Sequence, residues 1–425
     1  MPNKEIRIGI YCASSQTGRA YLADFLNEGY SVYGYVRNSA HAESFLKAVR
    51  EQGGLYLERP ANKNKETSRL IPVCEEQLGH DLKKLVWESD LIIIAEPSHY
   101  LQETILALKK EGLAEADVPV ILSPPRTFAV PYLWNILGTR HPFICFATNP
   151  YSCKAPAAGT AYIKRRKRCW VTSLEGCFKK SSIELLSKVF PQAIISYVPA
   201  VTSIGNIGAV FHPTPYVLKY EDIKKAQEEG VLYSYYMQAI GDSKEVSSLL
   251  EEIDQIRLKI ADKLGMETYG LRGKEREQEW AFLLGELRKI ENSTDDINKL
   301  RKARSETLSL LSGAIVSAQH WLDYTYGVER VIGESLGDTI KRTPTYQKMS
   351  VPQWRYVEED IPSSFLPIMM IAKRLEIDIA PMEYVMEQYH RKFPDSPKYF
   401  WRDLEEFSDE FIVEYLKGTY FTSKD

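Results

Sequence analysis

The sequence has few cysteines, and none lies in a pattern typical of a metal site or a disulfide framework. Six cysteines are scattered over 425 residues, with no Cys-x-x-Cys pair and no histidine at ligand spacing from any of them. Zinc sites need such spacing, and disulfide frameworks are typical of short secreted chains. We therefore expect no metal ion and no disulfide, and the cysteines should behave as small buried hydrophobic residues in a reducing cytosol.

The chain also lacks a long apolar run and an excess of charge of one sign. The uncharged stretch at residues 307–322 contains Ser, Gly, Gln and His and is too short to span a bilayer. The N-terminal sequence MPNKEIRIGIYC leads directly into a strand pattern, without the apolar segment of a secretion signal. A formal net charge of −3 gives no electrostatic reason to expect a nucleic acid or an anionic membrane as partner. We therefore expect a cytoplasmic protein that binds neither.

The length of 425 residues favours more than one domain. In residues 1–200, near-continuous apolar runs alternate with helical patterns, as is typical of parallel strands buried on both faces. The expected strands cover residues 6–12, 31–36, 90–95, 118–122, 143–147, 169–173 and 193–198. With a helix at 18–27, this order predicts an α/β fold with a Rossmann-like, doubly wound parallel sheet. Residues 201–425 contain long amphipathic patterns, such as 246–264, and predict a second, mainly α-helical domain that supplies the substrate site.

A run of five basic residues, KRRKR at 164–168, allows two interpretations. It could bind an anion, or it could be a solvated hairpin or strand edge that like charges keep from pairing. We favour the second, because a single short basic run is common in a chain with a net negative charge.

The turn after the first strand fits a dinucleotide site. Such a turn lets the backbone approach the pyrophosphate and points its amides toward it. Gly18 matches the last glycine of G-x-G-x-x-G, while small residues stand at the other two glycine positions. A serine hydroxyl here could also bind a phosphate oxygen, although the turn could instead only pack a domain that binds no nucleotide. The expected cofactor-binding residues of the turn are Ala13, Ser14, Ser15, Gln16, Thr17 and Gly18.

The second strand ends in Arg37, Asn38 and Ser39, nineteen residues after Gly18. An NAD enzyme carries an acidic group here for the ribose, whereas an arginine would hold a 2′-phosphate with its planar, charged fork. We therefore expect these three residues to bind NADPH, with NADH as a weaker alternative because no second basic residue follows. Pro97, after the third buried strand, is expected to line the nicotinamide side of the cofactor.

A histidine lies at the junction between the two predicted domains. His212 follows an apolar run and is followed directly by Pro213, and imidazole is the natural proton carrier near neutral pH. The acidic cluster before Pro362 could supply a carboxylate that orients it. A single histidine is more often structural than catalytic, so the residues alone leave both roles open.

Two motifs identify a resemblance. The sequences G-N-I-G-A-V-F-H-P-T-P at 205–215 and R-Y-V-E-E-D-I-P at 355–362, together with the degraded dinucleotide turn, resemble those of the opine dehydrogenases. The variant of the first motif and a longer helical insert resemble the staphylopine dehydrogenase branch, which includes pseudopaline and related opine-metallophore enzymes. The resemblance covers essentially the whole chain.

The resemblance implies an NAD(P)H-dependent oxidoreductase that reduces an imine formed between an α-keto acid and an amino group. It implies His212 as the catalytic acid and base, Asp360 as its partner and Asn206 in the substrate pocket. It also implies an opine-dehydrogenase-like helical domain and a homodimer. At Gly208 the chain departs from relatives in which an asparagine helps to hold the substrate.

The resemblance further implies the substrates. A histidine that carries an aminobutanoate arm would be condensed with pyruvate or 2-oxoglutarate, which gives a staphylopine- or pseudopaline-like metallophore. A keto acid's carboxylate needs a cationic or amide clamp, for which Tyr151, Lys154 and Arg355 are candidates, although a structural role is an equal alternative for each. Two alternatives remain at this point: another NADP-linked hydroxy- or amino-acid dehydrogenase, which would need no amine, and a non-catalytic NADP-binding sensor.

Overall fold

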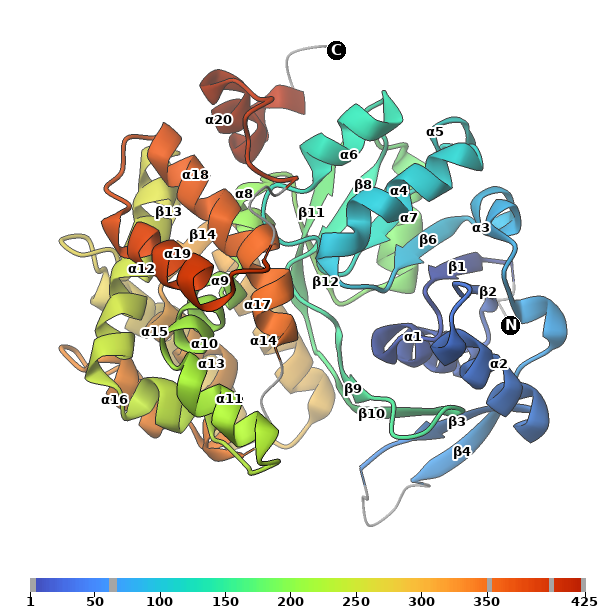
Figure 1. Cartoon of the computed structure of the whole chain (residues 1–425), viewed down its shortest axis with the longest axis horizontal. Helices are drawn as coiled ribbons and strands as arrows, with labels where there is room; N and C mark the ends of the chain where they lie inside the picture. The colour runs from blue at the N-terminus through green and yellow to red at the C-terminus, as the bar shows by residue number, and fades with distance from the viewer. Residues whose placement is uncertain (1–4, 61–66, 350–353, 397–400, 422–425) are drawn as a thin grey trace. The chain divides into compact units, whose positions relative to one another are not determined.

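The computed structural model describes residues 5–60, 67–349, 354–396 and 401–421 (Figure 1). It divides into two compact units. The first comprises Met1–Pro125 and Val130–Tyr197, and the second comprises Arg126–Ala129 and Val198–Asp425. The four residues Arg126–Ala129 therefore belong to the second unit although both flanking segments belong to the first. No pattern in the sequence predicted this excursion.

The first unit contains an eight-stranded sheet with the order β12-β11-β8-β7-β6-β1-β2-β5. All seven expected strands lie in this sheet, so the predicted α/β fold is confirmed. The short β5 was not predicted. The strands are β1 (Arg7–Tyr11), β2 (Ser31–Tyr35), β5 (Leu78–Gly79), β6 (Leu91–Ile94), β7 (Val120–Leu122), β8 (Phe143–Phe146), β11 (Trp170–Glu175) and β12 (Ala193–Ser196).

The sheet is mixed and not wholly parallel. Neighbouring strands pair in parallel from β5 through β2, β1, β6 and β7 to β8. Strand β11 runs antiparallel to β8, and β12 pairs in parallel with β11. A hairpin of β9 (Tyr151–Lys154) and β10 (Thr160–Arg166) lies between β8 and β11 in the chain, where a crossover helix would be needed for a parallel return. The expectation of a parallel sheet therefore fails at this edge.

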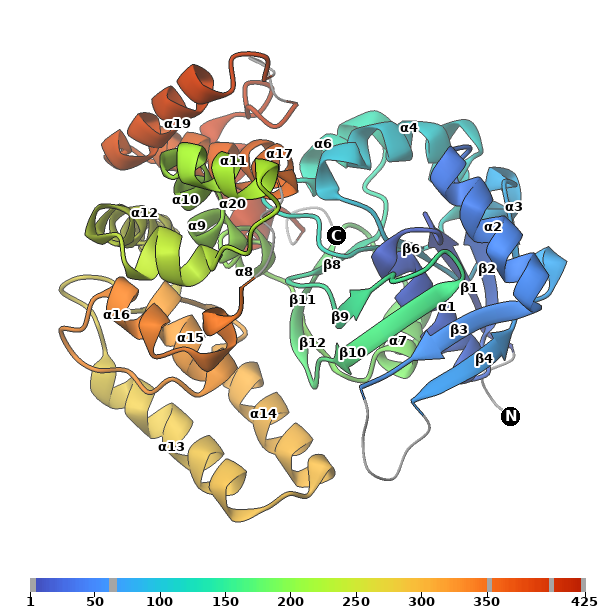
Figure 2. The same cartoon turned by 60° about the horizontal axis from the view of Figure 1, so that its bottom comes forward.

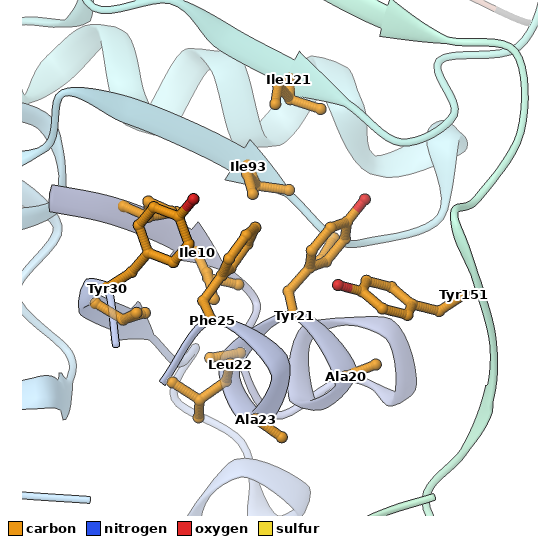
Figure 3. Close-up of a cluster of buried hydrophobic side chains, with 14 of the residues drawn as sticks. Ile10, Ala20, Tyr21, Leu22, Ala23, Phe25, Tyr30, Ile93, Ile121 and Tyr151 are labelled. Atoms are coloured by element: carbon orange, nitrogen blue, oxygen red, sulfur yellow. The ribbon is translucent and has the colours of Figure 1, made fainter. Parts of the chain in front are cut away.

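Helix α1 (Gln16–Asn27) packs on the sheet through a fully buried core. Ile10, Ile93 and Ile121 lie in register on neighbouring strands and face this helix (Figure 3). Tyr21 and Phe25 on α1 are completely buried, and their rings stack at 5.9 Å. Burying such a side chain contributes about 1.5–3 kcal/mol, so this layer fixes where α1 begins relative to β1.

Five more helices belong to the first unit besides the short α5 (Leu113–Ala116). They are α2 (Ala40–Gln52), α3 (Leu82–Glu88), α4 (Leu101–Lys110), α6 (Val130–Leu137) and α7 (Lys180–Val189).

A second, four-stranded sheet was not predicted. It has the order β4-β3-β10-β9, with β3 at Gly54–Glu58 and β4 at Ser68–Pro72 (Figure 2). The basic run at 164–168 begins in β10, within a hairpin as expected. Strand β3 pairs only with residues 160–162 of β10, so the basic residues of β10 pair with β9 alone. However, Arg166 bonds Asp24 at 3.1 Å and Glu28 at 2.8 Å. The interpretation as a solvated strand edge is therefore wrong for this arginine, which is held by carboxylates of α1.

The second unit is mainly helical, as expected, and has one two-stranded sheet of β13 (Glu267–Tyr269) and β14 (Ala314–Val316). Its longest helix, α12 (Lys244–Lys263), starts where Ser243 accepts a hydrogen bond from the amide of Val246, and it buries one apolar face. The π-helical segments η3 (Tyr235–Gly241) and η5 (Ile361–Phe365) interrupt the α-helical pattern. The other helices are α8 (Ala200–Ser203), α9 (Gly208–Phe211), α10 (Pro213–Leu218), α11 (Tyr220–Glu228), α13 (Glu277–Ser293), α14 (Ile297–Leu311), α15 (Ala318–Tyr326), α16 (Leu336–Lys341), α17 (Arg355–Asp360), α18 (Leu366–Arg374), α19 (Ala380–Lys392) and α20 (Asp409–Lys417).

None of the helices in the described part of the chain has both the length and the apolar composition needed to cross a bilayer.

Candidate active site

Gly18 allows α1 to approach the end of β1 closely. A Cβ atom at this position would lie 2.3 Å from the carbonyl oxygen of Cys12 and 2.8 Å from the Cα of Ala13. Neither backbone atom can move aside, because both belong to the turn that follows the strand. The glycine thus serves the close helix–strand packing that a dinucleotide turn requires. The N-terminus of α1, with its partial positive charge, is thereby placed beside the carboxyl end of β1.

The side chains of this turn are engaged inside the first unit. Ser15 caps α1: its hydroxyl accepts from the amide of Gly18 at 2.9 Å and donates to the carbonyl of Ala95 at 2.6 Å. The amide nitrogen of Gln16 donates to Cys153, and the hydroxyl of Thr17 accepts from an asparagine, Asn149. Since the one proton of the Ser15 hydroxyl is already used, the expected hydrogen bond from it to a phosphate is not supported. A phosphate here would instead meet backbone amides and the helix dipole.

Arg37, which follows β2, contacts a carboxylate that was not predicted. The side chain of Arg37 is 42% exposed, and its Nη1 lies 3.5 Å from a carboxylate oxygen of Glu96, whose side chain is fully buried. Arg37 also lies over the ring of Tyr100, at 5.3 Å. Asn38 and Ser39 are exposed.

Glu96 lies at the carboxyl end of β6, directly before Pro97. Its other oxygen accepts a hydrogen bond from Thr104, and burial raises the pKa of Glu96 to about 7 although Thr104 and Arg37 oppose that shift. We did not predict from the sequence that this carboxylate contacts Arg37. A glutamate that follows a run of buried isoleucines was the available signal.

The side chain of Tyr151 is engaged inside the first unit. It is buried, its hydroxyl donates to Asp24 at 2.6 Å, and its ring meets that of Tyr21 edge-on at 5.0 Å (Figure 3). These contacts favour a structural role, and the contact of Tyr151 with a substrate stays a prediction. Lys154 is exposed at the end of β9. Arg355 begins α17, and its side chain lies outside the described part of the chain.

His212 and Asp360, far apart in the sequence, lie together in the second unit. The Nδ1 atom of His212 lies 2.7 Å from Oδ2 of Asp360, and the two side chains are 18% and 0% exposed. His212 stands between α9 and α10 and is held there by Pro213, the first residue of α10. An Nδ1–H that donates to the carboxylate leaves Nε2 as the nitrogen that can give and take a proton.

Arg126 extends this pair. Its Nη2 lies 3.2 Å from Oδ1 of Asp360, and its Nε lies 3.5 Å from a carboxylate oxygen of Glu359. Burial alone would lower the pKa of Arg126, but the two carboxylates raise it above its ordinary value. We did not predict a role for Arg126, because nothing near position 126 in the sequence indicates a contact with α17.

Asn206 lies beside the same group. Its Nδ2 donates to Ser364 at 2.7 Å, and its Oδ1 accepts from the amide of Gly208 at 3.1 Å and lies 3.5 Å from Arg126. The carboxamide is buried and is bonded on both sides. The structure thus brings Asn206, His212 and Asp360, three of the predicted site residues, into one network.

Tyrosines surround the imidazole. The ring of Tyr356 lies 4.3 Å from that of His212, and Tyr235 donates a hydrogen bond to the His212 carbonyl at 3.0 Å. Tyr235 in turn packs against Tyr216, with ring centroids 4.7 Å apart, and burial raises its pKa well above the ordinary value. This aromatic surrounding was not predicted, although Tyr356 stands inside the second motif. It lowers the local polarity and so strengthens the ion pair beside it.

The six cysteines are all free thiols. The described residues include no group of three or more His, Cys, Asp or Glu side chains placed to hold a metal ion.

A protein-family model and a curated protein that match this chain both belong to the opine dehydrogenases. Residues 199–391 match the model of the NAD/NADP octopine/nopaline dehydrogenase α-helical domain. The opine dehydrogenase of Arthrobacter sp. (strain 1C) is 24% identical over 249 residues, which are 57% of this chain and 64% of that protein. The match thus spans less than two thirds of the relative's length.

Solved structures extend the likeness in fold to the whole chain. Yersinopine dehydrogenase with NADP+ bound has a TM-score of 0.61 at 13% identity and covers 100% of both chains. Octopine dehydrogenase with NADH and pyruvate has a TM-score of 0.60 at 12% identity and covers 91% of this chain and 89% of the other. The helical unit that holds His212 and Asp360 contains the matched region. Residues 199–391 thus resemble the α-helical domain of the octopine/nopaline dehydrogenases, and the whole chain has the fold of the solved opine dehydrogenases.

Proposed function

We propose that this protein uses NAD(P)H to reduce the imine that forms between an α-keto acid and an amino group, which gives an opine. The observation that carries the proposal is the hydrogen bond of 2.7 Å between His212 and Asp360 inside the helical domain of the family. A histidine held by a buried carboxylate is suited to move a proton at near-neutral pH.

The proposed chemistry assigns both proton steps to one imidazole. Nε2 of His212 takes a proton as the amine is made ready to attack the keto carbon. The protonated imidazole then gives a proton to the hydroxyl of the carbinolamine, which leaves as water and yields the imine in its protonated (iminium) form. Asp360 holds the ring in the required tautomer and stabilises its charged form. When bound, the nicotinamide cofactor supplies the hydride that reduces the imine carbon.

The first unit would hold the cofactor. The start of α1 offers amides and a dipole for the pyrophosphate, and Gly18 keeps that approach open. Arg37 is exposed enough to reach a 2′-phosphate, so we propose NADPH as the preferred cofactor and NADH as the weaker one. Asn38, Ser39 and Pro97 remain proposed contacts.

We further propose a histidine-derived amine that carries an aminobutanoate arm as the substrate, with pyruvate or 2-oxoglutarate as the keto acid. Support comes from the motif at 205–215 and from the tyrosines around His212, whose faces suit stacking against an imidazole ring. Asn206, Lys154 and Arg355 remain proposed substrate contacts.

NADPH oxidation measured against a panel of amines and α-keto acids, with mass spectrometry of the products, tests this function. We expect turnover only when both an amine and a keto acid are present. Equal turnover with the keto acid alone would favour an ordinary dehydrogenase. Tight NADPH binding without turnover for any pair would favour the sensor.

A further inference from the structure

The segment Arg126–Ala129 is built to bring one arginine to the catalytic pair. Arg126 has a φ of +67°, in the left-handed region that a non-glycine residue rarely adopts. The segment is fixed by the hydrogen bond from the Thr127 amide to the Ser363 carbonyl at 2.9 Å, and by one from the Thr127 hydroxyl to the Ser203 carbonyl. Arg402 bonds the carbonyls of Thr127 and Ser363 together. An unfavourable backbone held this firmly points to a role for the side chain.

Asp360 lies between two positively charged or protonatable groups. One carboxylate oxygen is 2.7 Å from the imidazole of His212, and the other is 3.2 Å from Arg126. An aspartate that is held on both oxygens cannot rotate away from the imidazole. Arg126 therefore acts on His212 through Asp360.

The charges of this group depend on His212. Arg126 carries one positive charge, while Glu359 and Asp360 carry one negative charge each. The group is neutral only when His212 is protonated. Among the described residues, the phenol rings of Tyr356 and Tyr235 also lie beside the imidazole, at 4.3 Å and 6.5 Å between ring centroids. The charge of Arg126 is thus what opposes protonation of the ring.

Gly208 leaves the room that Arg126 needs. A Cβ atom on residue 208 would lie 3.0 Å from Nη1 of Arg126 and 3.5 Å from Nδ1 of His212. A larger side chain at 208 would press on both groups at once. Arginine and imidazole are therefore close neighbours as well as partners of the same aspartate.

We infer that Arg126 is a positioning residue that locks Asp360 onto His212 and, by its positive charge, opposes protonation of the imidazole. The inference rests on the proposed role of His212 as acid and base. It names the residue that sets the pH range of that role, without contact of Arg126 with the reacting atoms.

Two variants of the full chain test the charge. Arg126→Gln removes it, and Arg126→Lys keeps it while losing the planar fork. The titration of the His212 ring is followed by NMR. Its signal is assigned by comparison with the single variant His212→Gln, in which Arg126 is unchanged. The pH dependence of kcat/KM is measured on the same proteins. For Arg126→Gln we expect the titration midpoint and the pH profile to move upward by about one pH unit or more, since a positive charge has been removed. For Arg126→Lys we expect a much smaller shift and a lower rate.

Glu359→Gln provides a variant with the opposite sign. It removes a negative charge beside Arg126, so the His212 titration should move downward. A His212 midpoint that stays in place in both Arg126→Gln and Glu359→Gln would overturn the inference. Should Arg126→Gln not fold, as judged by its melting temperature, the direction of the Glu359→Gln shift decides alone. The titration needs no turnover, so a wild type that lacks amine-dependent activity would refute the proposed function without deciding the role of Arg126.

Discussion

The buried carboxylate of Glu96 lies 3.5 Å from the guanidinium of Arg37. The residue expected to recognise a cofactor phosphate is therefore already paired with a protein carboxylate. A 2′-phosphate would compete with Glu96 for the same charge, and the outcome of that competition determines how strongly the protein prefers NADPH.

Replacing Arg37 with alanine should weaken NADPH selectively. Loss of a charge-assisted contact costs about 1.5–3 kcal/mol, which corresponds to roughly tenfold to a hundredfold in affinity. NADH affinity should change little, because NADH has no 2′-phosphate. Fluorescence titration of both cofactors into the wild type and the variant measures this. Equal loss for the two cofactors would show that Arg37 only supports the fold.

The preference for NADPH should depend on pH through Glu96. Because burial raises the pKa of Glu96 to about 7, the carboxylate is mostly protonated at pH 6 and mostly ionised at pH 8. Arg37 is released to the phosphate at the lower pH, so NADPH should be favoured over NADH more strongly at pH 6 than at pH 8. Glu96→Gln should bind NADPH more tightly at pH 8 and should lose most of the difference between the two pH values. If the ratio of NADPH affinity to NADH affinity changed with pH to the same extent in the wild type and in Glu96→Gln, Glu96 would be excluded as the cause of the pH dependence.

Removing the proton carrier should affect turnover and leave the fold intact. His212→Gln is expected to lower kcat by roughly 10²–10⁴-fold, the usual share of general acid–base catalysis. Asp360→Asn should also lower the rate, because the amide cannot stabilise a charged imidazole. NADPH affinity should barely change in either variant, since the proposed cofactor contacts belong to the other unit. A variant that melts early and keeps its turnover per folded molecule would instead identify His212 as a packing residue.

An alanine at position 18 should damage the cofactor turn. Its Cβ would lie 2.3 Å from the Cys12 carbonyl, and overpacking of this kind typically costs about 1–3 kcal/mol. We expect a lower free energy of unfolding and weaker binding of NADPH and NADH alike. Gly285→Ala in α13 is the matched control, because its Cβ would meet no atom within 4 Å. That control should be neutral or stabilise the helix by about 0.5–1 kcal/mol.

Tyr151→Phe separates a core residue from a substrate ligand. The change leaves Asp24 without the hydroxyl that now donates to it, which should lower the free energy of unfolding by about 1–3 kcal/mol. Arg59 and Arg166 still contact Asp24, so the protein should fold. KM for the keto acid should stay at the wild-type value. A raised KM with unchanged stability would restore Tyr151 as a substrate contact.

The sequence predicts those parts of the fold that local patterns determine. The seven large-sheet strands are runs of apolar residues, and α12 shows a helical period with a serine cap. The small sheet was missed because β4 has only one buried residue among five and carries no such pattern. The reversed direction of β11 depends on the hairpin before it, which contains no signal as strong as a buried run.

The site shows the same division. His212 and Asp360 could be named because each lies in a recognisable motif. Arg126 could not, because its role depends on a backbone conformation and on residues much later in the chain. The contact of Tyr151 with Asp24 could not be predicted for a related reason: a tyrosine that bonds a buried aspartate and one that binds a substrate look alike in sequence.

The excursion at Arg126–Ala129 has a consequence for biosynthesis. The chain passes from one unit to the other and back before its final crossing after Tyr197, so neither unit is a single continuous stretch of translated sequence. Arg126 leaves the ribosome long before Asp360. The carboxylates that Arg126 contacts therefore become available only when most of the polypeptide has been made. The group proposed to transfer protons therefore assembles late in synthesis, and a chain terminated before α17 would carry His212 without the aspartate that contacts it.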